Sequence, residues 1–417
     1  MKTFSLSWKY LWAKPLSLLL NVVLYGLGMG IVIFLILAQE QLSGNITNNS
    51  KGIDLVVGAK GSPMQLILSS IYHVDYPTGN IALKDAEKLT INRFVKTAVP
   101  LALGDAYKGV RIVGTTSKYV EIYNAEIETG ELWKHEMEVC LGAFAAEKLN
   151  LSVGDEFVGQ HGLADGGYEH DEHSKFRVVG ILAPTGRVID QLILANIEAV
   201  WAVHQLEENH EETEQTDSVT GVNFSQLIPS VNLHSVDSLR EITSLLIGYR
   251  SPMGAMQLPR YVNQKTNMQA ASPAFEMARL LTIVGVGVEV FEVFAYIILA
   301  VALLSVLISI YSALKDRKYD LAVMRALGAS KSTLFRSIVM EGMMVAFIGT
   351  VIGLCFGHLM IELVGFYMGS GSSFSGAIFS NKEVLVAVLG LMSGAVVAMI
   401  PAYELYKDDV SKTLTAD

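Results

Sequence analysis

The sequence predicts a membrane protein with four transmembrane α-helices and a large α/β domain inserted between helices 1 and 2. Three observations support this fold class. Four apolar stretches reach the roughly 20 residues needed to cross a bilayer. The first two are separated by about 240 residues that mix strand-like with helix-like patterns. The mean hydropathy of +0.40 is high for a soluble protein and low for a chain that lies in lipid throughout.

The charge is distributed unevenly. The net charge is −10, and residues 39–281 hold 19 Lys and Arg against 30 Asp and Glu, whereas the rest of the chain is nearly balanced. The acidity therefore belongs to the inserted domain and gives no reason to expect a nucleic-acid partner. Cys355 lies in an apolar stretch and Cys140 in the inserted domain. No disulfide is expected, and the domain must be held by its own core.

Residues 1–38 are expected to form a cytoplasmic N-terminal segment and transmembrane helix 1. The apolar stretch is 16–38, and three lysines precede it. Basic residues resist translocation, which places this end in the cytoplasm. A cleaved signal peptide is the alternative, but the stretch exceeds the usual ~7–15 apolar residues and lacks an A-x-A site.

Residues 39–272 are expected to form the inserted domain, with Gly and Pro between its elements. The expected strands are 53–57, 111–113, 176–182 and 227–233, and the expected helices are 85–92, 142–150, 196–208 and 236–246. Residues 273–314 are expected to form one helix, because only Gly285 and Gly287 interrupt an otherwise helix-compatible run. Such a helix would be roughly 60 Å long, twice the bilayer core. Its second half would be transmembrane helix 2, and its first half would be a stalk.

Residues 315–337 are expected to form a short cytoplasmic segment, because they are rich in Lys and Arg. Gly328 is a helix C-cap signal, and Ser330 is an N-cap candidate for a helix that begins at Lys331. A first helix here would offer an apolar face for packing and polar side chains for a soluble partner. The apolar face would comprise Leu321, Met324 and Leu327, and the polar side chains Lys318, Asp320 and Arg325. A solvated loop without a partner is the alternative.

Transmembrane helices 3 and 4 are expected at 338–368 and 384–406, with a cytoplasmic tail at 407–417. Glycines four residues apart occur in three of the four expected spans, namely Gly26 and Gly30 in the first, Gly349, Gly353 and Gly357 in the third, and Gly390 and Gly394 in the fourth. This spacing places glycines on one helix face, where backbones can approach closely. General enrichment of glycine in membrane helices is the alternative. The pattern does not distinguish packing within one protomer from packing between two.

Two pairs of ionisable residues are further candidates. Glu289 and Glu292 share a helix face at the outer edge of helix 2, where they could line the mouth of a substrate path. His358 and Glu362 share a face of helix 3. For the first pair, simple solvation at the interface is the alternative.

A glycine-rich loop holds His161, His170, Asp171 and His173. Imidazoles and carboxylates suit zinc or copper, so the loop is a candidate zinc site. Its irregular spacing is also typical of a solvated acidic loop. No Walker A motif occurs, because the run from Gly328 to Ser332 lacks a glycine directly before its lysine. The chain is therefore not expected to hydrolyse ATP, and no catalytic constellation stands out.

Several motifs resemble the FtsX/MacB-type, or type VII, permeases of ABC transporters. The segment DLAVMRALGAS at 320–330 is similar to the family segment before the third span, Glu341 stands at the start of that span, and Pro401 with Ala402 closes the last one. LNLSVGDEF at 149–157 and FRVVGILAPTG at 176–186 are similar to segments of the family's periplasmic domain. Lys318 and the tail residues 408–410 depart from the family pattern.

The resemblance implies an inner-membrane permease subunit that works as a homodimer on two copies of a separate ATPase, which binds ATP and Mg. Movement of the ATPases would pass to the periplasmic domain (mechanotransmission) and export or extract a lipoprotein, lipid, peptide or hydrophobic compound. It also implies a coupling site formed by Arg317, Lys318, Asp320, Leu321, Met324, Arg325, Gly328 and Ala329.

Two alternatives remain for the function. One is a regulator that transports nothing and acts on a periplasmic partner such as a cell-wall hydrolase. The other is a zinc-linked permease that uses the histidine-rich loop. A periplasmic or outer-membrane partner is compatible with all three functions.

Overall fold

A computed structural model describes residues 3–161, 175–203, 240–368 and 374–407. The chain divides into two compact units. Unit 1 comprises Met1–Ser43 and Ile283–Asp417, and unit 2 comprises Gly44–Thr282. Two helices, α2 (Pro15–Ser50) and α10 (Pro273–Asp316), contribute residues to both units. The α/β domain is thus inserted between the first and second long helices, as the sequence predicts.

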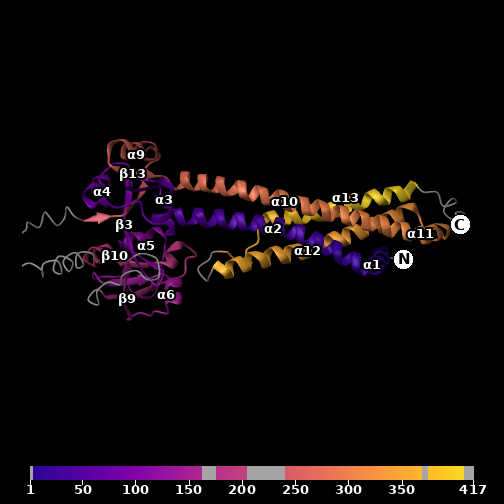
Figure 1. The fold of residues 1–417 in the computed structure, drawn as a ribbon, viewed down its shortest axis with the longest axis horizontal. Coiled ribbons are helices and arrows are strands. Elements are labelled where there is room, and N and C mark those ends of the chain that lie inside the picture. The colour runs from indigo at the N-terminus through magenta and orange to yellow at the C-terminus, as the bar shows by residue number, and fades with distance from the viewer. Residues whose placement is uncertain (1–2, 162–174, 204–239, 369–373, 408–417) are drawn as a thin grey trace, which may run out of the picture. The chain divides into compact units, whose positions relative to one another are not determined.

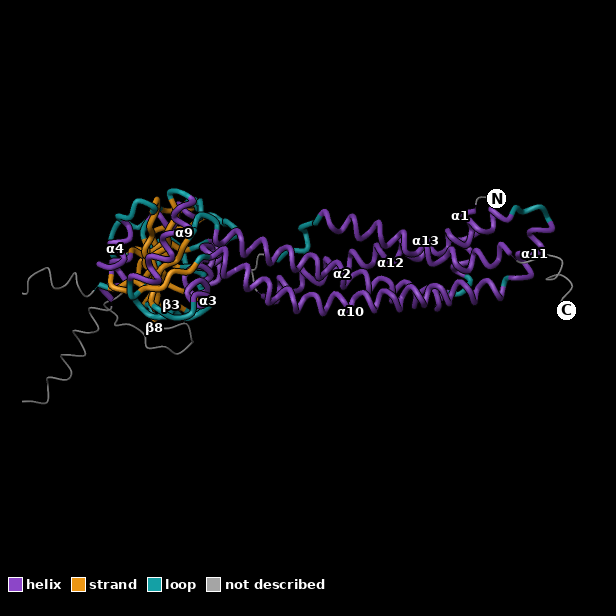
Figure 2. The backbone as a smooth tube through the Cα atoms, turned by 90° about the horizontal axis from the view of Figure 1, so that it is seen from above, coloured by secondary structure: helices purple, strands orange, loops and turns teal. Residues whose placement is uncertain are grey.

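Unit 1 is a bundle of helices (Figure 1). Besides its parts of α2 and α10, it contains α1 (Thr3–Trp12), α11 (Lys318–Ala326), α12 (Lys331–Met368) and α13 (Asn381–Lys407). Within the described residues, four helices are long and apolar enough to cross a membrane, namely α2, α10, α12 and α13. α1 and α11 lie at the same end of this bundle in both views (Figures 1 and 2). The four predicted transmembrane helices are therefore confirmed.

Local chemistry sets the ends of these helices. Gly328 follows α11 with φ at +100°, a left-handed conformation that glycine adopts without a steric penalty. The Thr333 amide then donates to Ser330 Oγ at 3.2 Å, and α12 begins at Lys331. Both capping predictions are confirmed. α10 runs unbroken from Pro273, as its lack of helix breakers predicts. α1 was not predicted, and it packs on α12, where Ser7 Oγ donates to the Ser337 carbonyl at 3.0 Å.

Unit 2 is built on an eleven-stranded sheet, counted over the described residues (Figure 2). Its main path runs β13-β1-β12-β3-β4-β10-β6-β9-β5, with β7 paired to β9 and β8 paired to β3. The strands are β1 (Leu55–Ala59), β3 (Val95–Tyr107), β4 (Val110–Thr115), β5 (Ile127–Gly130), β6 (Glu138–Leu141), β7 (Glu156–Val158), β8 (Gln160–His161), β9 (Lys175–Leu182), β10 (Ile193–Asn196), β12 (Ser244–Tyr249) and β13 (Met268–Ala271). β2 (Ile81–Ala82) and β11 (Glu241–Ile242) form a separate pair.

Short helices cover this sheet. They are α3 (Pro63–Ile67), the π-helix η1 (Leu68–Tyr72), α4 (Leu83–Thr90), α5 (Ser117–Ile122), α6 (Ala143–Leu149), the 3-10 helix η2 (Val188–Gln191) and α9 (Pro252–Lys265). β4–β10 and β6–β9 are parallel pairs, and the other pairs in the path are antiparallel.

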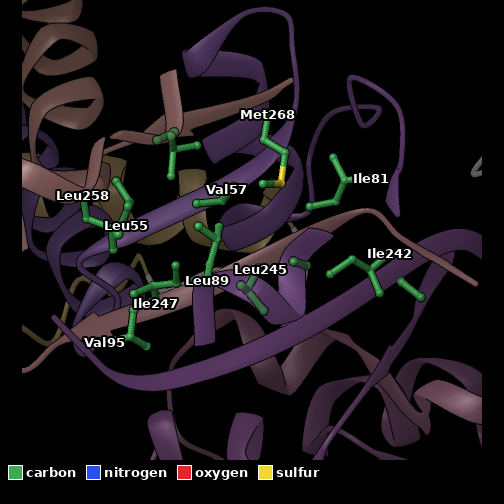
Figure 3. Close-up of a cluster of buried hydrophobic side chains, with 14 of the residues drawn as sticks. Leu55, Val57, Ile81, Leu89, Val95, Ile242, Leu245, Ile247, Leu258 and Met268 are labelled. Atoms are coloured by element: carbon green, nitrogen blue, oxygen red, sulfur yellow. The ribbon is translucent and has the colours of Figure 1, made fainter. Parts of the chain in front are cut away.

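Two hydrophobic clusters divide unit 2. The first cluster joins β1, β12 and β13 to α4 and α9, and Figure 3 shows Leu55, Leu89, Leu245 and Leu258 within it. The second cluster joins β4, β6, β9 and β10 to α6. β3 is 13 residues long, and it pairs with β12 of the first cluster and with β4 of the second. Unit 2 therefore has two halves, which share one sheet.

Most of the expected elements of unit 2 are present. β1, β4 and β9 overlap the predicted strands, and α4 and α6 overlap the predicted helices. Residues 197–203 are helical, and the predicted strand 227–233 lies outside the described residues. The predicted helix 236–246 is wrong in its described part, because β11 and β12 occupy it. Consecutive residues Leu245, Leu246 and Ile247 are all buried, so this central strand lacks the alternation that marks a strand exposed on one face.

Candidate functional site

The residues predicted to receive a soluble partner lie on and beside α11. Leu321 of α11 is buried in a cluster that also contains side chains of α2, α10, α12 and α13, and Met324 packs against this cluster. This cluster includes Val22, Val306, Ile310, Leu314, Leu334, Ile338 and Ala402. Burying a leucine side chain contributes about 1.5–3 kcal/mol. α11 is therefore fastened to the bundle by apolar packing.

The other side of α11 is exposed to solvent. Tyr319 is 62% exposed and Leu327 is 83% exposed, and Asp320 and Ala326 lie beside them in solvent. We call Tyr319, Asp320, Ala326 and Leu327 the exposed face of α11. Leu327 was expected on the same face as Leu321. At 3.6 residues per turn, six residues separate Leu321 and Leu327 by about 120° around the helix. Helical geometry alone therefore places the two leucines on different faces. Tyr319 was not predicted.

The remaining predicted coupling residues occupy varied positions. Lys318 is exposed at the start of α11, and Arg325 is half-buried near its end. The Gly328 amide donates to the Arg325 carbonyl at 3.0 Å, and the Ala329 amide donates to the Met324 carbonyl at 3.0 Å. Gly328 and Ala329 thus form the turn that leads into α12.

Arg317 faces inward. Its Nη1 and Nη2 donate to the two carboxylate oxygens of Glu341, each at 3.1 Å, and its guanidinium lies 4.3 Å from the ring centre of Tyr10. The side chain of Arg317 is 15% exposed and that of Glu341 is 6% exposed. A bidentate pair of this kind is geometrically specific. Arg317 therefore joins the turn between α10 and α11 to α12, beside α1, rather than lying on the exposed face of α11.

A cavity of about 140 Å³ adjoins this ion pair. Its polar lining includes Tyr10, Lys14, Asn21, Asp316, Arg317 and Glu341. Lys14 and Asp316 form a second ion pair at its rim. The end of the bundle that carries α11 is thus cross-linked by charged side chains as well as by apolar packing.

The seven predicted packing glycines lie where helices of unit 1 touch. A methyl group added to Gly353 would stand 2.6 Å from Met29 Cβ, and one added to Gly30 would stand 2.6 Å from Phe356 Cδ1. Gly26, Gly349 and Gly357 lie along the same contact between α2 and α12. These contacts are made within one chain.

Helix α13 also meets its neighbours through glycines. Gly390 faces Met29 and Thr350, and Gly394 faces Ala346. Two further glycines make similar contacts and were not predicted. Gly28 faces the backbone of Leu299 in α10, and Gly342 faces Ala398 in α13. Gly342 and Ala346 are four apart, as are Gly394 and Ala398, which is a small-residue signal in the sequence.

The His358 and Glu362 pair belongs to a polar cluster at the other end of α12. His358 Nδ1 donates to the Gly376 carbonyl at 2.7 Å, and its Nε2 lies 2.8 Å from Glu383 Oε2. Glu362 accepts from the Gly376 amide at 2.6 Å. Gln41 makes two bonds of 2.9 Å to the backbone of Ser375. These side chains hold residues 374–380 against α2 and α12.

Glu383 was not predicted, although the sequence contained a signal for it. Its Oε1 accepts from the Ser380 amide at 2.6 Å, and the Lys382 amide donates to Ser380 Oγ at 3.2 Å. A serine followed three residues later by a glutamate is the capping-box pattern that begins a helix.

Glu289 and Glu292 lie on α10 among exposed apolar side chains such as Val290 and Phe291. Glu289 is exposed and Glu292 is half-buried. Within the part of the chain that the structure describes, neither carboxylate has a hydrogen-bonding or ionic partner. The structure brings no other predicted site residue to them.

The predicted metal loop is only partly described. His161 lies in β8, opposite Asp105 of β3, and His170, Asp171 and His173 lie outside the described residues. Among the described residues, no group of three or more His, Cys, Asp or Glu side chains is arranged to hold a metal ion.

Comparisons with known families match both ends of the chain. Residues 18–236 match the family described as MacB-like periplasmic core domain, and residues 292–410 match the family described as FtsX-like permease C-terminal. Among curated protein sequences, none gives a significant match.

Two solved structures are similar to part of the chain. The periplasmic region of MacB from Actinobacillus actinomycetemcomitans is 11% identical, with a TM-score of 0.33, over 56% of this chain and 97% of that one. The extracellular domain of the noncanonic ABC-type transporter YknZ from Gram-positive bacteria is 14% identical, with a TM-score of 0.29, over 53% of this chain and 99% of that one.

Proposed function

Since this chain belongs to the FtsX/MacB-type permeases of ABC transporters, we propose that it converts ATP-driven movement of a partner ATPase into movement of its periplasmic domain. The family membership makes the chain a membrane-spanning subunit whose ATPase is a separate protein. We propose further that it lies in the inner membrane and acts as a homodimer on two ATPase copies. The cargo would be a lipoprotein, lipid, peptide or hydrophobic compound.

The observation that carries this proposal is the two-sided character of α11. One side is buried in the bundle through Leu321, and the other presents Tyr319 and Leu327 to solvent. An exposed tyrosine suits the centre of a small protein interface, because tyrosine is enriched among the residues that carry binding energy, and Leu327 adds apolar area beside it. A load on the exposed face of α11 would pass directly into α10 and α12, because α11 is joined to them by short turns and by the buried cluster.

The chain continues from unit 1 to unit 2 through helices. α2 and α10 each contribute residues to both units without a break. A helix is stiff along its axis, because every turn is cross-linked by backbone hydrogen bonds. Movement of the bundle would therefore reach the periplasmic domain as movement of α2 and α10.

The test is ATP hydrolysis by the purified complex of permease and ATPase in lipid nanodiscs, with and without a lipidated peptide. Leu327→Asp places a charge on the exposed face of α11 and should weaken ATPase binding by about 30-fold, the size of an interface hot spot. Ile378→Asp is the matched control, because Ile378 is also exposed but lies in the segment 374–380. If Leu327→Asp binds the ATPase as wild type does, α11 is not the coupling element.

The response to peptide separates transport from regulation. Stimulation of ATP hydrolysis by the lipidated peptide would support export of lipidated or hydrophobic cargo. A complex that assembles normally but ignores the peptide would favour the regulator of a periplasmic partner.

A further inference from the structure

The last two turns of α2, Gly44–Ser50, belong to unit 2 and are held there by polar contacts. Tyr72 Oη donates to the Ile46 carbonyl at 2.8 Å. The Val188 amide donates to Asn49 Oδ1 at 2.7 Å, and Arg187 Nη2 donates to the Lys51 carbonyl at 3.2 Å. Ser50 Oγ also donates to the Ile46 carbonyl at 3.3 Å, so this carbonyl accepts both from within α2 and from Tyr72.

These contacts come from the two different halves of unit 2. Tyr72 ends η1, which follows α3, and α3 packs on β1 and β13 of the first half. Arg187 and Val188 lie between β9 and β10 of the second half. The end of α2 is therefore attached to each half separately.

Arg187 also binds a second element, α5. Its Nη1 donates to the Ile122 carbonyl at 3.4 Å, and its guanidinium lies 4.2 Å from the ring centre of Tyr123, at the end of α5. One side chain thus joins the end of α2 to α5. A planar guanidinium can donate in two directions while it stacks on a ring, which a lysine cannot do.

The turn that carries Arg187 is fixed in place. Asp190 accepts from the Thr185 amide at 2.9 Å, from the Gly186 amide at 2.7 Å and from Thr185 Oγ1 at 2.8 Å. Gly186 has φ at +69°, where glycine avoids strain. Arg187 is therefore held in position before it makes its contacts.

Together with two further contacts, these interactions form a closed ring of contacts that begins and ends at the end of α2. Tyr123 packs on Tyr119 with ring centres 4.9 Å apart, and Tyr119 Oη lies 3.0 Å from His73 Nε2. His73 directly follows Tyr72 in the chain, and Tyr72 Oη donates to the Ile46 carbonyl of α2. His73 has φ at +54° and follows a π-helix, two backbone features that concentrate at functional sites.

We propose that Arg187 is a positioning residue that couples the end of α2 to the half of unit 2 built on β9 and β10. This inference rests on the proposed mechanotransmission and names the contact through which it would reach that half. Without Arg187, α2 keeps its attachment to the first half through Tyr72. Its direct attachment to the second half is then reduced to the bond from the Val188 amide to Asn49, so movement of α2 carries the second half less far.

The surroundings of Arg187 make this testable without unfolding the domain. An open polar cavity of about 410 Å³ adjoins it, lined by residues that include Asn48, Lys51, Tyr123 and Asn124. When the side chain is shortened, water can enter this cavity and bind the two released carbonyls. Arg187→Ala is therefore expected to fold.

The experiment measures distances between spin labels in the full permease with its ATPase in nanodiscs, in a Cys355→Ala background because Cys140 is buried. Gly44→Cys reports the end of α2, and a methyl group there meets nothing within 4 Å. Glu128→Cys, exposed on β5, reports the second half. Each label is placed singly, so the distance joins the two protomers.

In wild type, binding of ATP with vanadate should shift both distances. In Arg187→Ala, the Gly44 shift should persist and the Glu128 shift should become smaller, because the bond from the Val188 amide to Asn49 remains. Arg177→Ala is the matched control, because Arg177 is an exposed arginine on β9, and it should keep both shifts. Tyr72→Phe removes the bond to the other half and should also keep the Glu128 shift.

A Glu128 shift as large in Arg187→Ala as in wild type would overturn the inference. If Arg187→Ala does not fold, Arg187→Lys keeps the charge but cannot span both carbonyls, and it should reduce the Glu128 shift. If neither label moves in wild type, the proposed function fails. The inference is then judged by the distance between Gly44 and Glu128 within one chain, whose distribution should broaden in Arg187→Ala and stay narrow in Arg177→Ala.

Discussion

α11 in unit 1 and the end of α2 in unit 2 are fastened by different forces. α11 is held mainly by burial of Leu321 among apolar side chains from four other helices. The end of α2 is held by hydrogen bonds from Tyr72, Arg187 and Val188. Apolar burial has no preferred direction, whereas hydrogen bonds weaken steeply when their angles change. α11 can therefore adjust to a partner, while the end of α2 keeps a fixed orientation within unit 2.

The largest effect is expected from the buried ion pair of Arg317 with Glu341. Glu341→Ala leaves the guanidinium of Arg317 without its partner in a largely buried site, which should cost about 3–5 kcal/mol of stability. Thermal unfolding in detergent measures this cost. The double variant Glu341→Ala with Arg317→Met should recover much of it, because no unpaired charge remains. An unchanged melting temperature in Glu341→Ala would mean that apolar packing alone holds this end of the bundle.

The two leucines of α11 should separate stability from coupling. Leu321→Ala is expected to cost about 2–5 kcal/mol, because it opens a cavity in the buried cluster. Leu327→Ala should change stability by less than about 0.5 kcal/mol, because its side chain is exposed. It should nevertheless reduce ATP hydrolysis by the complex of permease and ATPase. Melting curves and ATPase assays on the same samples give both readings. Equal stability losses would contradict the two-sided description of α11.

The stability of unit 2 should depend on pH through His73, which belongs to the ring of contacts at the end of α2. Burial, aided by Arg111, lowers the pKa of His73 to about 3, whereas an unfolded histidine titrates near 6.5. Between these values the unfolded chain binds the extra proton, so stability rises with pH and is complete above the unfolded pKa. Lowering the pH from 7 to 5 should cost about 2 kcal/mol from this residue.

His73→Asn provides the control for this pH effect, because asparagine tolerates the left-handed backbone and does not titrate in this range. Unfolding curves of the variant should show a shallower loss of stability between pH 7 and 5 than those of wild type. Parallel curves would show that His73 is not the source.

The smallest measurable loss of stability is expected from Tyr72→Phe. It removes the hydrogen bond from Tyr72 Oη to the Ile46 carbonyl and should cost about 0.5–1.5 kcal/mol. Arg187→Ala removes two bonds and a ring contact, so its loss should be larger. Denaturant unfolding of both variants in one background provides the measurement. The reverse order would mean that the end of α2 depends mainly on the first half of unit 2.

The sequence predicted α11 better than the ring around α2, because the signals for α11 are local. Gly328, Ser330 and the basic residues between two apolar runs lie within a few residues of one another. Tyr72, Tyr123 and Arg187 are far apart in the chain, and the fold alone brings them together. Arg187 directly follows the family-like segment 176–186, but nothing in its local pattern indicates that it reaches Lys51.

Two other differences have physical causes. The predicted helix 236–246 includes the first three residues of β12. The apolar residues of β12 are continuous and do not alternate, because its place between β1 and β3 buries both of its faces. Among the candidate sites, the polar cluster around His358 was half predicted. The spacing of His358 and Glu362 on one helix face is local, but Glu383 and Gln41 come from other helices.

α2 and α10 are continuous across the boundary between the units. This continuity restricts which insertions the chain can accept in evolution and in engineering. A flexible linker tolerates insertions, but a helix keeps its phase. One residue inserted in α2 at Ser43 would rotate everything beyond it by about 100° and advance it by about 1.5 Å. Seven residues would come close to restoring the phase, since they make nearly two full turns. Periplasmic domains exchanged between relatives should therefore be joined in helical register, and lengths that differ by one or two residues should be selected against.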